Sequence, residues 1–179
     1  MCGRYHFGFN ESNISKQIKE KIQQLSLDDF NTGEIFPNDK AIVLIAKENK
    51  LDLDIKTWGI KLDKMMINAR IESLNNHFYD HIRDKRCVII ADSFYEWKDK
   101  TKYRIHNLDK TYMYLAGIYN DDNHFLIITK ESTYPMDKIH HRSPVIMNKK
   151  EMIDYLNHKG KITDHSDIEI LPAKMDALF

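Results

Sequence analysis

The amino-acid sequence predicts a single α+β domain with an antiparallel-rich β-sheet and a few helices. Short apolar runs follow one another between residues 86 and 130 with turn-rich pieces between them, whereas helical periodicity is confined to three segments. The 179-residue chain is long enough to bury a core. It contains no repeat, low-complexity tract or linker, so we expect one domain spanning residues 1–179.

Three helices are expected. Apolar residues recur at helical spacing in Asn10–Leu25, which predicts an amphipathic helix. A second helix is predicted over Ile71–Ile82. The third covers Lys149–Asn157, with Asn148 as its N-cap and Gly160 as its end.

The other apolar runs predict strands. Ala41–Lys47 is a compact β-branched run, typical of a buried strand. Leu51–Gly59 begins by alternating apolar and charged residues, the period of a half-exposed strand. Five further short runs cover residues 86–91, 94–98, 102–108, 111–119 and 124–130. Because little helix separates these runs, antiparallel pairing is favoured over a doubly wound parallel sheet.

Composition is that of a globular protein. Hydrophobic residues make up 42% of the chain and charged residues 30%. No stretch approaches the roughly 20 apolar residues of a membrane span, and the first residues lack a secretory signal pattern, so we expect a cytoplasmic protein without a membrane segment. Cys2 and Cys87 provide neither a disulfide framework nor a CxxC zinc motif. We therefore expect no cofactor and no metal.

Charge is distributed unevenly although the net charge is zero. Between Lys56 and Arg104, eleven Lys and Arg face seven Asp and Glu. A basic face on a neutral protein suits a polyanion, because neutralising phosphates releases counterions. The alternative is an ordinary solvated surface of mixed charge.

The chain opens with Met-Cys-Gly-Arg-Tyr. A small second residue favours removal of Met1, which would leave Cys2 with a free α-amine beside its thiol. Their unperturbed pKa values are about 8 and 8.5, so both are available near neutral pH. A 1,2-aminothiol condenses with aldehydes to a thiazolidine ring. By position alone, the simpler interpretation is that Cys2 is an incidental second residue.

The segment Ile67–Glu72 reads INARIE. The Asn68 amide is suited to hold an amine or a substrate oxygen, and Arg70 is suited to grip a phosphate. In the alternative interpretation, Asn68 is a turn residue and Arg70 forms a surface ion pair with Glu72.

The segment Phe94–Lys98 reads FYEWK. Glu96, flanked by aromatic residues, is a candidate general acid or base, because partial burial raises the pKa of a carboxyl group. Trp97 offers a ring for base stacking. The alternative is an edge strand with aromatic residues in the core.

The segment Ile139–Pro144 reads IHHRSP. Histidine as a residue type exchanges protons near neutral pH, so His140 is suited to transfer protons to and from a sugar oxygen. A metal site including His77 and His81 is a weaker alternative, since no HExxH or carboxylate pattern accompanies them. A surface or capping pair of histidines is the other alternative.

In this order, MCGRY, NARIE, FYEWK and IHHRSP resemble the SOS response-associated peptidase (SRAP) family. Its members share MCGR, N-A-R-x-E, [FY]-E-W-K and H-x-R-x-P. The resemblance runs from Met1 to about Met147, and Trp58-Gly59 matches a further Trp-Gly pair of the family. It implies a single α+β domain around a twisted, barrel-like antiparallel sheet with flanking helices.

The resemblance also implies a function in DNA damage. Family members bind single-stranded DNA and crosslink to abasic sites, so we expect such DNA as the partner of a monomeric protein. By matching motifs, the catalytic residues would be Cys2, Asn68, Glu96 and His140, and the DNA-binding residues Arg4, Trp58, Arg70, Trp97 and Arg142. His140 would help to open the closed sugar, and Glu96 would move protons during Schiff-base formation.

Two other functions remain open. A cysteine-dependent peptidase would use Cys2 to cut the Met1–Cys2 bond or another protein, although no clear Cys–His–Asp pattern supports it. A non-catalytic single-strand binder would rely on the tryptophans and the basic face, and it leaves Cys2, Glu96 and His140 without a role.

The chain departs from the family pattern in three places. Glu34 stands where many members carry the Asn of an N-x-A-P stretch. The loop after Gly59 is short and lacks the usual proline and second Trp. The C-terminal segment Glu169–Phe179 does not match the valine- and asparagine-rich end of the family. These departures bear on the path of the DNA more than on the chemistry.

Overall fold

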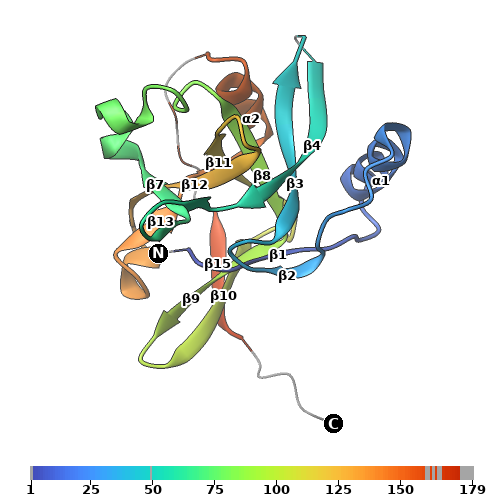
Figure 1. Ribbon diagram of the computed structural model, residues 1–179. Coiled ribbons are helices and arrows are strands. Elements are labelled where there is room, and N and C mark those ends of the chain that lie inside the picture. Colours follow the sequence, from blue (N-terminus) through green and yellow to red (C-terminus); the bar gives the residue numbers. More distant parts are fainter. Residues whose placement is uncertain (1, 49, 160–161, 163, 165–166, 174–179) are drawn as a thin grey trace.

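The computed structural model describes residues 2–48, 50–159, 162, 164 and 167–173. Within these residues a five-stranded and an eight-stranded sheet lie beside a two-stranded ribbon, with α1 and α2 on the outside (Figure 1). The predicted α+β class with a twisted, barrel-like sheet is confirmed.

The eight-stranded sheet forms the barrel-like part of the fold. Because β12 pairs with both β4 and β11, the strands β12, β4, β3, β8 and β11 close into a ring. The pairings of β12 with β4 and β7 are parallel, so this sheet is mixed. Its strands are β3 (Lys40–Lys47), β4 (Lys50–Trp58), β7 (Asn68–Arg70), β8 (Arg86–Ala91), β11 (Met113–Tyr119), β12 (His124–Glu131), β13 (Arg142–Pro144) and β14 (Ile146–Met147).

The five-stranded sheet is antiparallel and carries the N-terminal segment. Its order is β15-β10-β9-β1-β2, and one of its faces buries a row of apolar side chains against the larger sheet. The strands are β1 (Tyr5–Phe7), β2 (Gly33–Ile35), β9 (Ser93–Lys98), β10 (Thr101–Asn107) and β15 (Ile168–Pro172). Residues paired across neighbouring strands form this row, in the order Ile35, Tyr5, Phe94, Ile105 and Ile170.

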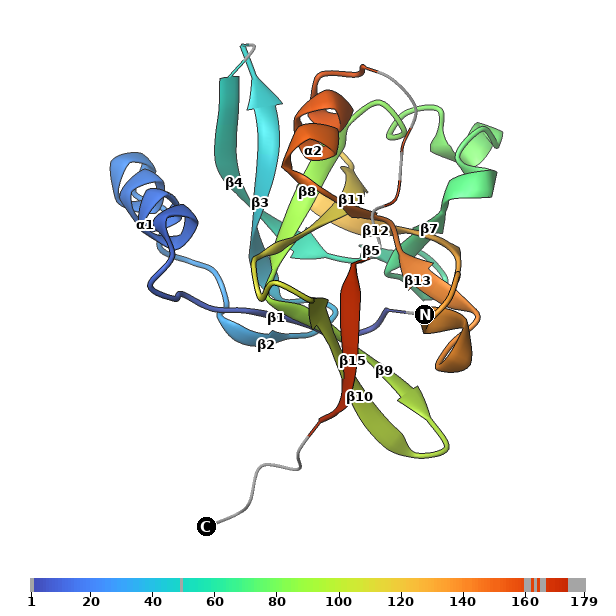
Figure 2. The same ribbon diagram turned by 180° about the vertical axis from the view of Figure 1, so that it is seen from behind.

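The first and third expected helices are present. The helix α1 (Asn13–Leu25) starts at Ser12, whose hydroxyl accepts a hydrogen bond from the Ser15 backbone N–H, and lies beside β4 (Figure 1). The helix α2 (Lys149–Leu156) packs on β8 and β11 (Figure 2). As expected, Asn148 caps α2, here in a capping box with Glu151. Gly160 lies outside the described residues.

The predicted helix over Ile71–Ile82 is wrong. The structure has two single turns of 3-10 helix instead, at Ile71–Ser73 (η1) and His77–Tyr79 (η2), with turns after each. Asn75 and Asn76 lie between them, and Asn side chains favour turns over helix interiors. The apolar spacing reflects Leu74, Tyr79 and Ile82, which pack on the barrel from separate turns.

The short loop after Gly59 forms the two-stranded ribbon of β5 (Ile60–Lys61) and β6 (Met65–Met66). In the described part of the chain, no helix is both long and apolar enough to cross a bilayer.

Candidate active site at the N-terminus

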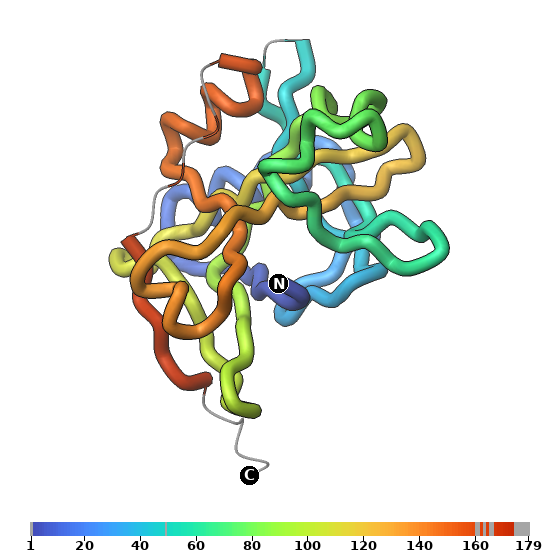
Figure 3. The backbone as a smooth tube through the Cα atoms, turned by 90° about the vertical axis from the view of Figure 1, so that its left-hand side faces the viewer, coloured from blue at the N-terminus to red at the C-terminus, as the bar shows by residue number. Residues whose placement is uncertain are grey.

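Cys2 lies between the two sheets, just before β1. It is completely buried, and its carbonyl oxygen accepts a hydrogen bond from Asn68 Nδ2 at 2.9 Å. Figure 3 shows the N-terminal end in the centre, with β9 below it and the segment before β13 to its left. Segments that are far apart in sequence therefore meet at Cys2.

Asn68 is held by its own strand and by the residue before it. Parallel pairing of β7 with β12 aligns Asn68 with Ile127, and Trp58 Nε1 donates a hydrogen bond to the Ile67 carbonyl at 3.0 Å. Asn68 is buried, and its Oδ1 has no hydrogen-bond partner among the described residues. A buried acceptor without a partner is costly, so Asn68 Oδ1 has the capacity to accept a hydrogen bond at this point.

Glu96 is buried on β9, with 3% of its surface exposed. Strand alternation directs its side chain to the same face as Phe94, the face that meets the larger sheet. Burial, and secondarily the charge of Glu96, raises the pKa of the Cys2 thiol well above its usual range. The folded chain therefore keeps this thiol protonated near neutral pH.

His140 is half-buried on the loop between η3 (Met136–Lys138) and β13. The backbone N–H of Arg142 donates to His140 Nδ1 at 3.0 Å. The same Nδ1 lies 3.1 Å from the Arg142 carbonyl oxygen, so the backbone of Arg142 orients the His140 ring in either tautomer. Lys98, at the end of β9, ties this loop to the strand of Glu96 by donating to the Lys138 carbonyl at 2.8 Å.

Arg142 is not exposed as a phosphate ligand. It is 6% exposed, and its guanidinium donates to both carboxylate oxygens of Glu72 and to the Thr129 carbonyl. The hydrogen bond from Arg142 lowers the pKa of Glu72. In this structure Arg142 therefore joins β13 to η1 and β12, which corrects the expectation that it is available to DNA.

Trp58 also differs from the expectation. It is completely buried, with its ring 5.2 Å from that of Tyr5 and stacked at 6.3 Å from that of Phe125. Such a ring cannot stack on a base. Through the Ile67 carbonyl, Trp58 supports Asn68 from within the core.

The remaining predicted DNA-binding residues lie at the surface. Arg70 is exposed at the end of β7. Trp97 is 39% exposed, and the Arg4 guanidinium lies 5.0 Å from its ring centroid. Sequence reasoning missed the ion pair that Arg4 makes with Glu34. The sequence shows that Glu34 departs from the family pattern. It does not show on which face of the sheet Glu34 lies, because that follows from the side-chain alternation of the short strand β2.

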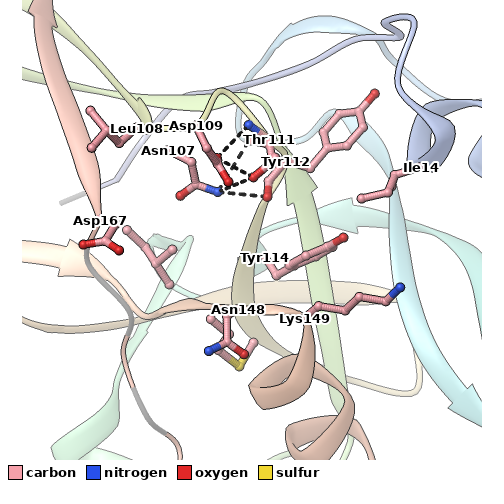
Figure 4. Close-up of a pocket in the computed structure, with 12 residues that line it drawn as sticks. Ile14, Asn107, Leu108, Asp109, Thr111, Tyr112, Tyr114, Asn148, Lys149 and Asp167 are labelled. Atoms are coloured by element: carbon pink, nitrogen blue, oxygen red, sulfur yellow. Dashed lines mark hydrogen bonds between the residues drawn. The ribbon is translucent and has the colours of Figure 1, made fainter.

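The metal alternative finds no support in the geometry. His77 Nδ1 pairs with Asp80, and no three His, Cys, Asp or Glu side chains gather at a metal-binding distance among the described residues. A pocket of about 470 Å³ lies elsewhere, at the turn between β10 and β11 and the start of α2 (Figure 4). None of the predicted site residues lines it.

Comparison with known proteins matches the chain to one family along almost its whole length. The family model described as "SOS response associated peptidase (SRAP)" matches residues 1–178. The chain is 30% identical to the abasic site processing protein YobE of Bacillus subtilis (strain 168), over 98% of this chain and 91% of that protein. It is also 30% identical to the abasic site processing protein YoqW of the same organism, over 98% of this chain and 89% of that protein.

Solved structures share the fold. A crystal structure of a protein from Bacteroides thetaiotaomicron superposes with a TM-score of 0.75 at 19% identity, covering 98% of this chain and 93% of the other. One from Bordetella bronchiseptica gives a TM-score of 0.73 at 14% identity, covering 97% of this chain and 100% of the other. With its family model matched from end to end, the chain belongs to the SOS response associated peptidase family.

Proposed function

We propose that this protein processes abasic sites in single-stranded DNA, as a monomer, by bonding covalently to them through Cys2 after Met1 is removed. The observation that carries the proposal is the hydrogen bond from Asn68 to the Cys2 carbonyl, in a site where Glu96 acts electrostatically on the Cys2 thiol. The names of the relatives from Bacillus subtilis support abasic DNA as the substrate class.

The chemistry needs no oxidant or cofactor. The α-amine of Cys2 adds to the C1′ aldehyde of the open sugar, and the carbinolamine loses one water to give a Schiff base. The thiol then adds to the C=N carbon, its sulfur bonding to C1′ while its proton moves to the nitrogen. The product is a thiazolidine, formed from aldehyde and aminothiol with the loss of one water.

Asn68 and Glu96 have separate tasks in this sequence. The amide oxygen of Asn68, a buried acceptor with no described partner, is suited to orient the α-amine toward the aldehyde. Glu96 is suited to shuttle the protons of carbinolamine dehydration and of thiol addition. Because the thiol is held protonated, it gives up its proton as the S–C bond forms.

His140 is suited to open the ring of the abasic sugar. A closed hemiacetal opens when a proton is supplied to its ring oxygen and its hydroxyl proton is removed. The His140 imidazole, oriented through Nδ1 by the backbone of Arg142, is a proton carrier of the right kind.

The DNA strand would be held by the exposed groups around this site. Arg70 is suited to contact a phosphate, and Arg4 and Trp97 provide a cation and a ring for a flanking nucleotide. We assign Arg142 to orienting Glu72 and the His140 loop instead, because its guanidinium is already hydrogen-bonded within the protein. Specificity for damage then comes from the aldehyde, which intact DNA lacks.

A peptidase activity confined to the Met1–Cys2 bond is compatible with the same residues, since it prepares the α-amine. It would appear as a loss of Met1 in the purified protein without an added aminopeptidase.

The test is adduct formation on a denaturing gel. Met1-free protein is incubated with a single strand carrying one abasic site, beside the variants Cys2→Ala and Cys87→Ala. Cys87 is the matched control, because it is an equally buried free cysteine on the barrel strand β8. We expect Cys87→Ala to keep the heat-stable adduct and Cys2→Ala to lose it. An adduct that survives in Cys2→Ala overturns the proposal.

A further inference from the structure

Next to the N-terminal site, the outer face of the five-stranded sheet carries a compact charged cluster. It consists of Arg4, Glu34, Phe36, Trp97 and Lys102, here called the Glu34 cluster. Alternation along β2 and β9 places Glu34 and Trp97 on the face opposite the buried row. The Arg4 carbonyl accepts from the Tyr95 N–H at 2.9 Å, which fixes the start of β1 against β9.

Both cations of the cluster lie against aromatic rings. The Arg4 guanidinium lies 4.3 Å from the Phe36 ring centroid and 5.0 Å from that of Trp97. Lys102 Nζ lies 4.0 Å from the Tyr95 ring centroid. Phe36 and Trp97 are 40% and 39% exposed. Cations interleaved with exposed rings are the pattern by which proteins bind single-stranded nucleic acid.

Glu34 bridges the two cations. Its Oε2 accepts from Arg4 Nη1 at 3.2 Å, and its Oε1 pairs with Lys102 Nζ. The three side chains are between 27% and 30% exposed, so solvent and ligands reach them. The Glu34 carboxylate thus places one oxygen on each cation.

We propose that Glu34 is a built-in competitor for DNA phosphate at Arg4 and Lys102. A phosphate of the bound strand must displace the Glu34 carboxylate before it gains these two cations. This inference rests on the proposed function, because it takes single-stranded DNA as the ligand. Its consequence is that the protein binds undamaged strands weakly and retains a strand mainly through the covalent step at Cys2.

The test measures non-covalent binding to an undamaged, fluorescein-labelled oligothymidylate by fluorescence anisotropy at low salt. The variant Glu34→Gln keeps the size of the side chain and removes its charge. We expect it to bind about 3- to 10-fold more tightly than the parent, the scale set by partly exposed ion pairs. Glu20→Gln is the control, since Glu20 is exposed on α1, outside the Glu34 cluster, and the substitution removes the same charge.

The gain in DNA affinity of Glu34→Gln must depend on Arg4 and Lys102. Adding Arg4→Ala and Lys102→Ala to Glu34→Gln should abolish it, and Glu20→Gln should change affinity by less than about 2-fold, because exposed charges far from the ligand are screened. Unchanged or weaker binding by Glu34→Gln, an undetectable affinity in both proteins, or an equal gain in Glu20→Gln overturns the inference.

The same samples separate the two proposals. Abasic oligonucleotide is added to the parent and to Glu34→Gln, and adducts are counted on a denaturing gel. Failure of the parent to form an adduct refutes the proposed function. Adduct formation without an affinity gain in Glu34→Gln refutes only the role of Glu34.

Discussion

Cys2 and Glu96 act on each other in a way that restricts what the thiol can attack. A buried carboxylate near a buried thiol disfavours the thiolate, and the raised pKa of Cys2 reflects both effects. Such a thiol is a poor general nucleophile. In the proposed mechanism, the thiol adds only after the α-amine has formed a Schiff base beside it, because the imine nitrogen then accepts the thiol proton.

The effect of Glu96 on the Cys2 thiol predicts that one substitution changes the rates of alkylation and of crosslinking in opposite directions. In Met1-free protein, Glu96→Gln removes the charge that raises the Cys2 pKa, so alkylation of Cys2 by iodoacetamide should become about 3- to 10-fold faster. Crosslinking to an abasic strand should become slower. Peptide mapping by mass spectrometry separates Cys2 from Cys87. Slower alkylation together with slower crosslinking would indicate a general disruption of the site.

His140 and Glu96 should affect different steps. His140→Ala should slow capture of the closed abasic sugar by about a hundred-fold or more, while its reaction with a simple free aldehyde stays near the parent rate. Glu96→Ala should slow both reactions, since carbinolamine proton transfers remain in each. Single-turnover rates on the two substrates, with melting temperatures as the control for folding, decide the matter. Equal slowing of both substrates by His140→Ala contradicts the assignment to ring opening.

At the scale of elements, the end of β4 holds the residue that precedes Asn68 in the candidate site. Gly59 has φ +104°, and a Cβ there would lie 2.7 Å from Met65 Sδ, so the Trp-Gly pair needs its glycine. The preceding Trp58 fills the core and holds the Ile67 carbonyl next to Asn68. The pair is therefore structural rather than a surface for stacked bases.

Trp58→Phe tests this role. It removes the indole donor to the Ile67 carbonyl, which keeps its hydrogen bond from the Ile127 N–H, and it shrinks a completely buried side chain. We therefore expect a loss of about 1–3 kcal/mol in the free energy of unfolding. Affinity for an undamaged single strand should stay unchanged at a temperature where the variant is folded. Urea unfolding followed by circular dichroism measures the first quantity and anisotropy the second. A large loss of DNA affinity in stable protein would return Trp58 to the DNA surface.

Secondary structure could be predicted where patterns were long and local. The strands β3, β4, β8, β9, β10 and β12 were found to within one or two residues, and β11 begins two residues after the predicted start. The short strands β1, β2, β7 and β13 were missed, because three residues carry no readable alternation and exist only through pairing with distant partners. The false helix at Ile71–Ile82 arose from apolar spacing produced by tertiary packing.

The whole molecule assembles the site from these short strands. β1, β7, β9 and the loop before β13 are brought together only when the barrel and the five-stranded sheet pack on each other. The motifs identified the family and two residues that interact with Cys2 in the structure, Asn68 and Glu96. They did not reveal that Trp58 and Arg142 are buried, because burial depends on that packing.

The exposed cation Arg70 should contribute to the affinity for DNA but not to the rate of the crosslinking reaction. Arg70→Ala should weaken binding to intact and abasic strands alike, and it should reduce the slope of log affinity against log salt by about 0.7 on a single strand. Titrations at several salt concentrations measure the slope. Arg83→Ala is a suitable control, since Arg83 is a surface cation already paired with Asp80. An unchanged slope in folded Arg70→Ala removes Arg70 from the DNA surface.

The central claim is that Cys2 forms a thiazolidine with the abasic sugar, and the intact mass of the adduct tests it most directly. Met1-free protein bound to an abasic oligonucleotide should have the summed mass of the two components less one water, and digestion should leave the sugar on the peptide that begins at Cys2. A mass showing no loss of water, an adduct on any other residue, or the same adduct in Cys2→Ala contradicts the claim.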